Sequence, residues 1–367
     1  MKAIIRSIVI SLTISSSFAF NFTSEDFDEA SVHVNYDSIA TTDSDTNNIK
    51  EEINEGFTSN TANQVVAPPP IPKSSTYRFY SASSDTEKEV QNSVKSGVDV
   101  ENLAKQIYWV HSFKVMELNN PKWSFANNAT IHPKSVASVI KLPVVNVALR
   151  EMKAGKINPR KQLKVTANNI QSYDGEPVGQ SYTVTKAIHA TLYRSSNTCP
   201  NLLAQELGGL DATKTKLKQL GYGSTGYNYL SAKKRTETPS FKVGSTADDL
   251  ADSVYDFYHK YRHVQNINRR DSAWHAFTKT KYKIKVPGAT NTGGKIGTNS
   301  NSSTYAGIYN INGIDYIIVT LIDRQSFNKK YKGRINADKG DKALEEANAI
   351  IVKTIQENRE INLSKGN

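Results

Sequence analysis

A serine and a lysine that could act together stand three positions apart in the first half of the chain. Ser138 and Lys141 precede the apolar run 142–149, which has the composition of a buried helix. Residues three apart share one face of a helix, so the lysine amine is expected against the serine hydroxyl at the helix N-terminus. A serine hydroxyl attacks poorly at its own pKa, and a partly desolvated lysine can accept its proton. The pair is therefore a candidate activated nucleophile.

A four-residue pattern of this kind also arises by chance, because serine and lysine are common, so it needs chemical partners elsewhere. Two follow in the chain. Ser195-Ser196-Asn197 stands between helical patterns at 185–194 and 201–207, which predicts a short connection between two helices. Lys295-Ile296-Gly297 stands in a glycine-rich stretch ahead of two strand-like runs. The chain thus carries three short motifs in a defined order.

These motifs, S-x-x-K, S-x-N and K-x-G, resemble the motif set of the penicillin-recognising serine enzymes, and in particular that of class A β-lactamases and their relatives. The similarity covers roughly residues 98–360. Besides the motifs, it includes Ala154-Gly155-Lys156-Ile157-Asn158, Tyr182-Thr183-Val184, Leu207-Gly208-Gly209 and Leu220-Gly221-Tyr222.

The resemblance implies a role for each matched catalytic residue. Ser138 would be the nucleophile that is acylated, and Lys141 its base or proton relay. Ser195 would return the proton to the leaving nitrogen. The backbone N–H groups of Ser138 and Thr298 would form the oxyanion hole, which binds charge that develops only in the transition state.

The resemblance also implies a set of substrate-binding residues. Asn197 would hold the amide of the substrate, and Lys295 would supply positive charge for its carboxylate. Gly297 and Thr298 complete this set at the end of the third motif. No metal and no organic cofactor is implied.

The chain departs from the pattern of the family in three ways. Ile296 stands where Thr or Ser is usual, so a hydroxyl that helps to bind the substrate carboxylate is missing. Ser196 replaces a common Asp, which is expected to affect the bracing of the loop. The E-x-x-L-N context of the glutamate that activates the deacylating water is absent. Glu237 is the single carboxylate within 220–246 and thus the candidate base, although it could equally pair with Arg235 at the surface.

The N-terminal residues 1–19 have the pattern of an export signal. Lys2 and Arg6 precede an apolar stretch too short to span a bilayer, and Ser17-Phe18-Ala19 is a small-x-small cleavage pattern. We therefore expect a periplasmic or secreted protein. Cys199 is the only cysteine, which excludes an internal disulfide, and it is expected to pack in the core.

An acidic, proline-rich leader is predicted at residues 20–75. Between positions 20 and 60 ten acidic residues face a single basic one, Lys50, with few apolar side chains. Such a stretch cannot bury enough surface to offset its ordering entropy, so we predict that it is disordered. The enzyme domain is expected at 98–360.

The net charge of +11 is carried by the part of the chain that follows this leader. The lysines at 279, 281, 283 and 285 alternate, which on a strand would place all of them on one face. A solvated face explains this pattern, and attraction to an anionic envelope polymer or membrane surface is the functional alternative. Nucleic acid is not expected as a partner, because of the export signal and the lack of a binding motif.

The pattern of elements predicts an α/β plus all-α fold. It indicates helices at 98–106 and 342–357, a mostly helical region at 138–260, strands at 107–118, 123–125, 283–286, 294–298, 305–311 and 314–322, and a type I′ hairpin at Asn312-Gly313. An antiparallel sheet flanked by N- and C-terminal helices, with an inserted helical subdomain, matches the β-lactamase/transpeptidase-like fold that the resemblance implies.

Three functions remain open at this stage. The first is hydrolysis of β-lactam amides through a Ser138 acyl-enzyme, with antibiotic resistance as the consequence. The second is a peptidoglycan D-Ala-D-Ala carboxypeptidase or transpeptidase that acts on stem peptides, which a missing deacylation glutamate would favour. The third is a non-catalytic envelope-binding homologue, against which the intact set of Ser, Lys, Ser, Asn and Lys argues.

Overall fold

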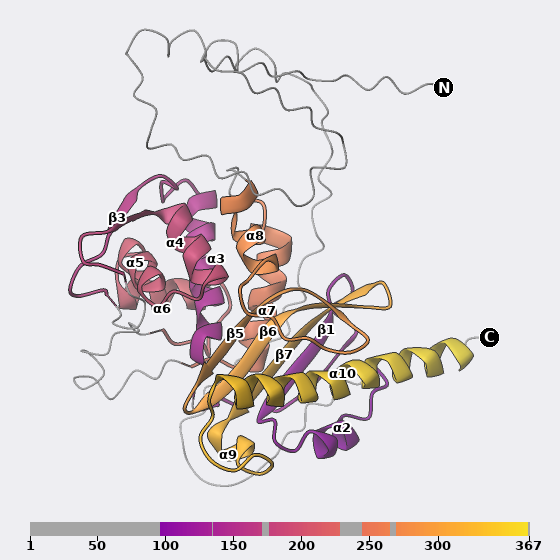
Figure 1. The fold of residues 1–367 in the computed structure, drawn as a ribbon. Coiled ribbons are helices and arrows are strands. Elements are labelled where there is room, and N and C mark those ends of the chain that lie inside the picture. The colour runs from indigo at the N-terminus through magenta and orange to yellow at the C-terminus, as the bar shows by residue number, and fades with distance from the viewer. Residues whose placement is uncertain (1–95, 134, 171–175, 228–243, 265–268, 366–367) are drawn as a thin grey trace, which may run out of the picture. The chain divides into compact units, whose positions relative to one another are not determined.

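The computed structural model describes residues 96–133, 135–170, 176–227, 244–264 and 269–365 (Figure 1). The chain divides into two units, residues 1–71 and 72–367, and every described residue belongs to the second unit. The expected export signal and leader at 1–75 therefore lie outside the described residues, and so does Glu237. None of the described helices is long and apolar enough to cross a membrane.

An antiparallel sheet of five described strands forms the centre of the second unit. In spatial order these strands are β2 (Ser124–Asn127), β1 (Ser112–Glu117), β7 (Ile314–Asp323), β6 (Ser302–Ile311) and β5 (Thr290–Asn299). Strand β1, from the start of the domain, pairs with β7 from near its end, and Val115 lies opposite Ile318. This pairing joins the two ends of the domain. Strand β5, which carries the third motif, lies at the edge of the sheet.

Helices cover both faces of the sheet and form a layer beside it (Figure 1). The described helices inserted between β2 and β5 are the 3₁₀ helix η2 (Ala137–Ile140), α3 (Lys141–Lys153), α4 (Val184–Tyr193), α5 (Thr198–Glu206), α6 (Leu210–Gln219), α7 (Ala247–Asp256), the π-helical turn η3 (Phe257–Tyr261), the 3₁₀ helix η4 (Arg269–Asp271) and α8 (Ala273–Thr278). The flanking helices are α2 (Val100–Gln106), α9 (Arg324–Phe327) and α10 (Ala337–Lys365). The fold class predicted from the sequence is confirmed.

The residues of β7 alternate between the two hydrophobic clusters of the domain. Ile317, Val319 and Leu321 belong to the cluster shared with α3 and α7. Ile318 and Ile322 belong to the cluster shared with α2 and α10. Successive side chains of a strand point to opposite faces of the sheet. Because helices cover both faces here, the strand is apolar from Tyr316 to Ile322, with Thr320 as the one polar residue.

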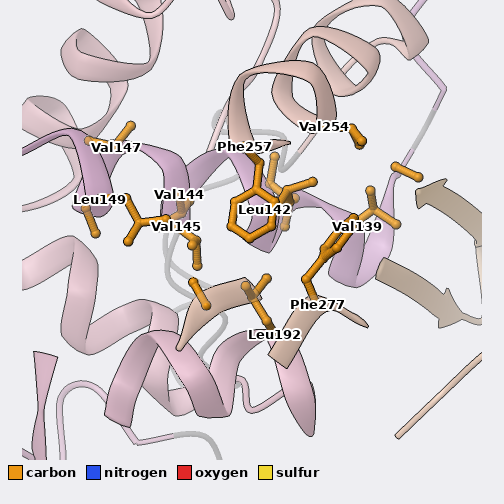
Figure 2. Close-up of a cluster of buried hydrophobic side chains, with 14 of the residues drawn as sticks. Val139, Leu142, Val144, Val145, Val147, Leu149, Leu192, Val254, Phe257 and Phe277 are labelled. Atoms are coloured by element: carbon orange, nitrogen blue, oxygen red, sulfur yellow. The ribbon is translucent and has the colours of Figure 1, made fainter. Parts of the chain in front are cut away.

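Helix α3 is buried on every side within the helical layer (Figure 2). Every residue from Lys141 to Leu149 is buried, and Leu142 and Val145 share their cluster with Leu192 of α4 and Phe277 of α8. A helix that is apolar around its circumference is stable only inside a core. The first residue of the helix, Lys141, is therefore carried into the interior.

The turn between β6 and β7 is the predicted type I′ hairpin. Its two central residues have positive φ angles, 51° at Asn312 and 84° at Gly313. This left-handed backbone matches the twist of the flanking strands. Asn and Gly adopt it at lower cost than other residues, which is why the dipeptide predicted the turn.

The predicted strand at 283–286 is wrong. These residues have no strand partner among the described residues, and the Ile284 carbonyl instead accepts hydrogen bonds from Asn291 Nδ2 at 3.2 Å and Tyr309 Oη at 3.3 Å. Side chains thus satisfy a backbone group that a sheet ladder would have satisfied. All four lysines of 279–285 are nevertheless exposed.

Two further differences concern element boundaries and a small sheet. The first strand begins at Ser112 rather than at 107, because helix α2 extends to Gln106 and a turn follows it. A short two-stranded sheet of β3 (Gln162–Lys164) and β4 (Ser181–Thr183) was not predicted. Its strands are too short for the alternation of polar and apolar residues to identify them.

A buried carboxylate on α7 fixes the loop that follows α6. Asp249 is 7% exposed, and its Oδ2 accepts hydrogen bonds from Ser224 N and Thr225 Oγ1, both at 2.9 Å. Burial raises the pKa of this carboxyl from its ordinary 3.8 to about 6, although both hydrogen bonds oppose the rise. Because the pKa of Asp249 is higher in the folded state than in the unfolded state, this residue favours folding most when its carboxyl group is protonated.

We expect the Asp249→Asn variant to gain stability relative to the wild type as the pH rises from 4 to 7.5. The contribution of Asp249 is fully present below pH 3.8 and is lost as the pH rises through about 6. Asparagine keeps the acceptor oxygen and never acquires the charge. At about 1.4 kcal/mol per pH unit, the difference amounts to at most about 3 kcal/mol. Urea unfolding of both proteins at the two pH values measures it, and a constant difference would contradict the expectation.

Candidate active site

Ser138 lies in the 3₁₀ turn η2 that leads into α3, rather than in the α-helix itself. The preceding residue, Ala137, has a φ of 44°, a left-handed conformation that is costly for alanine. The hydroxyl of Ser135 accepts a hydrogen bond from Ala137 N at 3.1 Å and so supports this turn. Ser138 is therefore half-buried at the edge of a pocket, whereas Lys141 points into the core.

The Lys141 amine is completely buried and lies among four oxygen atoms. Its Nζ is 3.0 Å from Ser138 Oγ, 2.5 Å from the Ser195 carbonyl oxygen, 3.1 Å from Ser195 Oγ and 2.7 Å from Asn197 Oδ1. The carbonyl oxygen and Asn197 Oδ1 can only accept, so the amine donates an N–H to each of them. A neutral amine then has one lone pair left, which the Ser138 hydroxyl can approach. The geometry suits a base that takes the serine proton.

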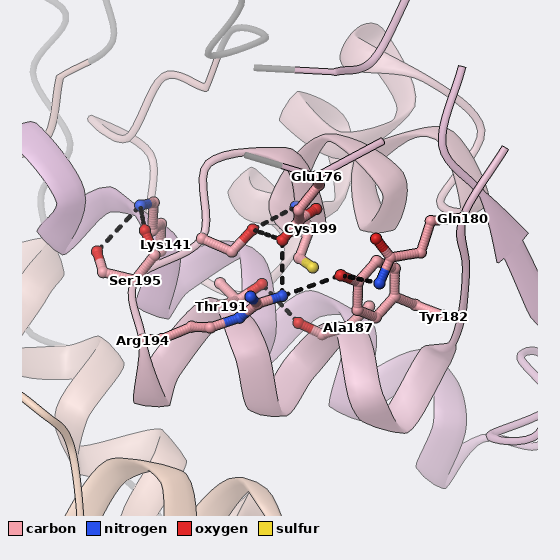
Figure 3. A network of polar contacts seen from close by, with 10 residues as sticks. Lys141, Glu176, Gln180, Tyr182, Ala187, Thr191, Arg194, Ser195 and Cys199 are labelled. Carbon is pink, nitrogen blue, oxygen red and sulfur yellow. Dashed lines mark hydrogen bonds and ion pairs between the residues drawn. The ribbon is translucent and has the colours of Figure 1, made fainter. Parts of the chain in front are cut away.

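Ser195 lies on the connection between α4 and α5 and faces two amines. Its Oγ accepts a hydrogen bond from Lys295 Nζ at 2.8 Å. It is also within reach of Lys141 Nζ, as Figure 3 shows. Its backbone has a φ of 59°, a second left-handed residue in the site that is not glycine. Strain of this kind persists only where the surroundings impose it. The hydroxyl is thus placed to pass a proton from Lys141 towards the pocket.

Lys295 projects from edge strand β5 and is 1% exposed. Besides Ser195 Oγ, its Nζ donates to the Ile296 carbonyl oxygen at 2.8 Å. Burial lowers the pKa of Lys295 well below its usual value, and the nearby Lys141 amine adds to this effect. Two buried lysines close together each make the charge of the other more costly.

Gly297 allows β5 to pass directly against the nucleophile. A Cβ at this position would collide with the backbone nitrogen of Ser138 and would lie 2.9 Å from that of Val139. Thr304 of β6 holds the same region, since its Oγ1 contacts the Val136 carbonyl at 2.8 Å and the Gly297 carbonyl at 3.1 Å. Thr298, the other expected oxyanion-hole residue, follows at once along β5. The strand and the nucleophile turn therefore meet backbone to backbone.

A pocket of about 470 Å³ opens over these residues. Of the residues expected from the sequence, it is lined by Ser138, Ser195, Asn197, Gly297 and Thr298. Lys141 and Lys295 lie behind this lining and reach it through the Ser195 hydroxyl. The pocket is also lined by four charged residues that the sequence reasoning did not place in the site, Glu176, Arg194, Lys281 and Asp341. Glu237, the expected deacylation base, lies outside the described residues.

Glu176 is a buried carboxylate that braces the second motif (Figure 3). Its Oε1 lies 2.6 Å from Arg194 Nη2 and accepts a hydrogen bond from Ser196 Oγ at 3.2 Å. Ser196 Oγ in turn accepts from the backbone N–H of Cys199 at 3.1 Å, at the start of α5. A carboxylate from a distant loop therefore stands beside the position where the resembled family carries an aspartate. Cys199 itself is completely buried and packs in the core, as expected.

Comparison with known proteins gives a family and a fold. The model of the beta-lactamase enzyme family matches residues 98–355. The solved structure of PBP-A is 17% identical to this chain with a TM-score of 0.55, and the match covers 70% of this chain and 96% of that chain. A beta-lactamase from Xanthomonas campestris pv. campestris is 14% identical with a TM-score of 0.55, and the match covers 70% of this chain and 97% of that chain. A variant of the class A beta-lactamase of the last common ancestor of Gram-negative bacteria is 18% identical with a TM-score of 0.54, and the match covers 69% of this chain and 94% of that chain. No curated protein matches the chain. At these identities the solved structures show the fold alone.

We expect Glu176 and position 196 to be energetically coupled. Glu176→Gln removes the charge that holds Arg194, and Ser196→Asp places a second carboxylate beside the first, so each change is expected to cost about 1–2 kcal/mol of unfolding free energy. In the double variant the new aspartate can take over the contact with Arg194. The double variant should therefore be more stable than the sum of the single effects by about 1 kcal/mol or more.

Urea unfolding of the four proteins measures this coupling. Glu206→Gln is the matched control, because Glu206 is also a mostly buried carboxylate, but it pairs with Lys161 outside the pocket. Combined with Ser196→Asp, the control should give additive effects. Additivity in the Glu176 cycle as well would show that this carboxylate does not brace the motif.

Proposed function

The chain belongs to the beta-lactamase enzyme family, and from that premise we propose that it is a serine hydrolase that opens β-lactam amides through an acyl-enzyme on Ser138. One observation carries the proposal. The buried Lys141 amine contacts Ser138 Oγ and Ser195 Oγ while two acceptor-only oxygens orient it. This arrangement joins a nucleophile, its base and a route for the proton in one hydrogen-bonded group.

Acylation follows from these contacts. The Ser138 oxygen attacks the carbonyl carbon as its proton moves to the Lys141 amine, 3.0 Å away. Negative charge develops on the carbonyl oxygen beside the Ser138 and Thr298 N–H groups, where β5 meets the nucleophile turn. The proton then passes from Lys141 to Ser195 Oγ, 3.1 Å away, and on to the leaving nitrogen as the C–N bond breaks.

Deacylation needs a base for the attacking water, and here the proposal has two branches. In the described part of the pocket the carboxylates are Glu176 and Asp341, and both already accept hydrogen bonds from side chains of the protein. We assign the base in the β-lactamase branch to Glu237 instead, because it is the single carboxylate in the stretch 220–246, where the resembled family supplies this base. The family's E-x-x-L-N context is absent, which favours a second candidate, a D-Ala-D-Ala peptidase that acts on peptidoglycan stem peptides and keeps a β-lactam adduct for long periods.

The same proposal includes the place of action. Residues 1–19 carry the export pattern, and a peptidoglycan or β-lactam substrate is met outside the cytoplasmic membrane. A solved structure of a PBP-A mutant is described as an acyl-enzyme complex with penicillin G, which supports penicillin G as the probe for this chain. The match between this chain and that mutant covers 97% of the mutant chain at 16% identity.

We expect Ser138→Ala to abolish the covalent adduct with penicillin G. The change removes one half-buried oxygen and leaves the turn and α3 intact. Intact mass recorded over time after mixing gives the readout. The control is Ser224→Ala, which removes an exposed serine outside the pocket and should leave the adduct unchanged. An adduct of unchanged yield in Ser138→Ala would overturn the assignment, and no adduct in the wild type would favour a non-catalytic binding protein.

We expect Glu237→Gln to leave acylation nearly intact and to slow hydrolysis by on the order of 10²–10⁴-fold, the usual effect of removing a general base. The acyl-enzyme should then accumulate. Stopped-flow acylation and mass-detected decay of the adduct separate the two steps. Equal decay rates in the variant and the wild type, with a long-lived adduct in both, would exclude Glu237 and favour the peptidase candidate.

A further inference from the structure

One end of the pocket carries an acid at the place where the substrate carboxylate would be expected. Asp341 lines the pocket together with Ile296 and Thr298. It follows Gly340 near the start of α10, where a Cβ would lie 2.8 Å from Ser303 Oγ and 2.9 Å from Thr298 Cγ2. The absence of a side chain at Gly340 lets the helix approach the end of β5. Asp341 is thereby brought within hydrogen-bond distance of Thr298.

The hydrogen bonds at this end direct the Thr298 proton away from the substrate. Thr298 Oγ1 lies 3.3 Å from Asp341 Oδ1 and 3.0 Å from Ser303 Oγ. A hydroxyl has one proton and an ionised carboxylate can only accept, so Thr298 donates to Asp341 and Ser303 donates to Thr298. The free face of Asp341 therefore presents an acceptor to the pocket.

Nothing else on the end of β5 offsets this acceptor in the described pocket. Ile296 is 8% exposed and packs in the cluster with α10, so the usual hydroxyl of the third motif is replaced by carbon. The Lys295 amine is directed to Ser195 Oγ and the Ile296 carbonyl. Burial raises the pKa of Asp341, the Thr298 hydrogen bond opposes the rise, and Glu345 and Asp338 add to it. A second anion here would meet further like-charge repulsion.

Two positive side chains also line the pocket, and both belong to residues beside the C-terminus of α4. Arg194 is paired with Glu176 there, at 2.6 Å. The backbone N–H of Lys281 donates to the Tyr193 carbonyl at 3.0 Å, which places this lysine next to the same helix end. The charge of Arg194 is thus paired with that of Glu176 beside the second motif, whereas Asp341 contacts Thr298 at the end of the third.

We propose that the Asp341 end of the pocket selects an uncharged, N–H-bearing group of the substrate, such as a carboxamide, and disfavours a free carboxylate. Asp341 is the specificity-determining residue, because its oxygen accepts the N–H of a carboxamide and repels a carboxylate. The inference rests on the proposed acylation at Ser138 and adds the chemical class of the group beside the scissile amide.

Three forms of one probe test the inference: penicillin G as the free acid, as the methyl ester and as the carboxamide. For the wild type, second-order acylation rates should be highest for the carboxamide, lower for the ester and lowest for the acid. Asp341→Asn should shift the ratio of acid to carboxamide towards the acid by roughly ten- to a hundred-fold, the scale of close like-charge contacts. The ester, which has neither the charge nor the N–H, should change least.

Asp338→Asn is the matched control, because it removes the same charge from an exposed position in the first turn of α10 outside the pocket. It should leave the three rates in their wild-type order. An unchanged ratio in Asp341→Asn would overturn the inference, and so would an equal shift in Asp338→Asn, which would show a general field effect rather than recognition.

A binding measurement separates this inference from the proposed function. If none of the three probes acylates the wild type, the proposed function fails, and affinities measured by calorimetry in a Ser138→Ala background decide the inference instead. Preference for the carboxamide that disappears on adding Asp341→Asn supports it. Preference for the acid, equal affinities or no binding of any form overturns it.

Discussion

The burial of the Lys141 amine is the constraint on which the site depends. Residues 141–149 of helix α3 are all buried, so the first residue of the helix enters the core, and an amine there is stable only if its polar atoms are satisfied. The oxygens that satisfy it come from Ser138 in the preceding turn and from Ser195 and Asn197 on a connection more than fifty positions away. The requirement to satisfy one buried group therefore assembles two of the three motifs.

The third motif reaches the same point through a close approach of two backbones. Strand β5 is an edge strand, and Gly297 lets it run against the turn that holds Ser138 without a side chain between them. The same strand brings Lys295 under Ser195, so a second buried amine depends on a hydroxyl that Lys141 also contacts. The left-handed backbone at Ala137 and Ser195 is the local cost of these contacts, and the rigid helical core around α3 maintains it.

Two carboxylates line the pocket and contact the second and third motifs. Glu176 compensates in space for the serine at 196 and pairs with Arg194, whereas Asp341 places an acceptor beside Thr298. One therefore supports the shape of the second motif, and the other determines what the end of the third can bind. In the proposed function, acyl transfer and substrate preference are thus carried by different residues, as is common where one fold serves several substrates.

The sequence alone determined the features that follow from short-range rules. The spacing of Ser138 and Lys141 predicted their contact because three residues make about one helical turn, and Asn312-Gly313 predicted its hairpin because both residues tolerate positive φ. Order and spacing of the motifs led to the family and the fold class. The prediction of a strand at 283–286 was wrong because the alternation of lysines with other residues is a local signal, whereas a strand also needs a neighbouring strand with which its backbone can pair. Only the tertiary structure brought Glu176 to Ser196 and Asp341 to Thr298, since such contacts depend on how whole elements pack and leave no periodic pattern in the chain.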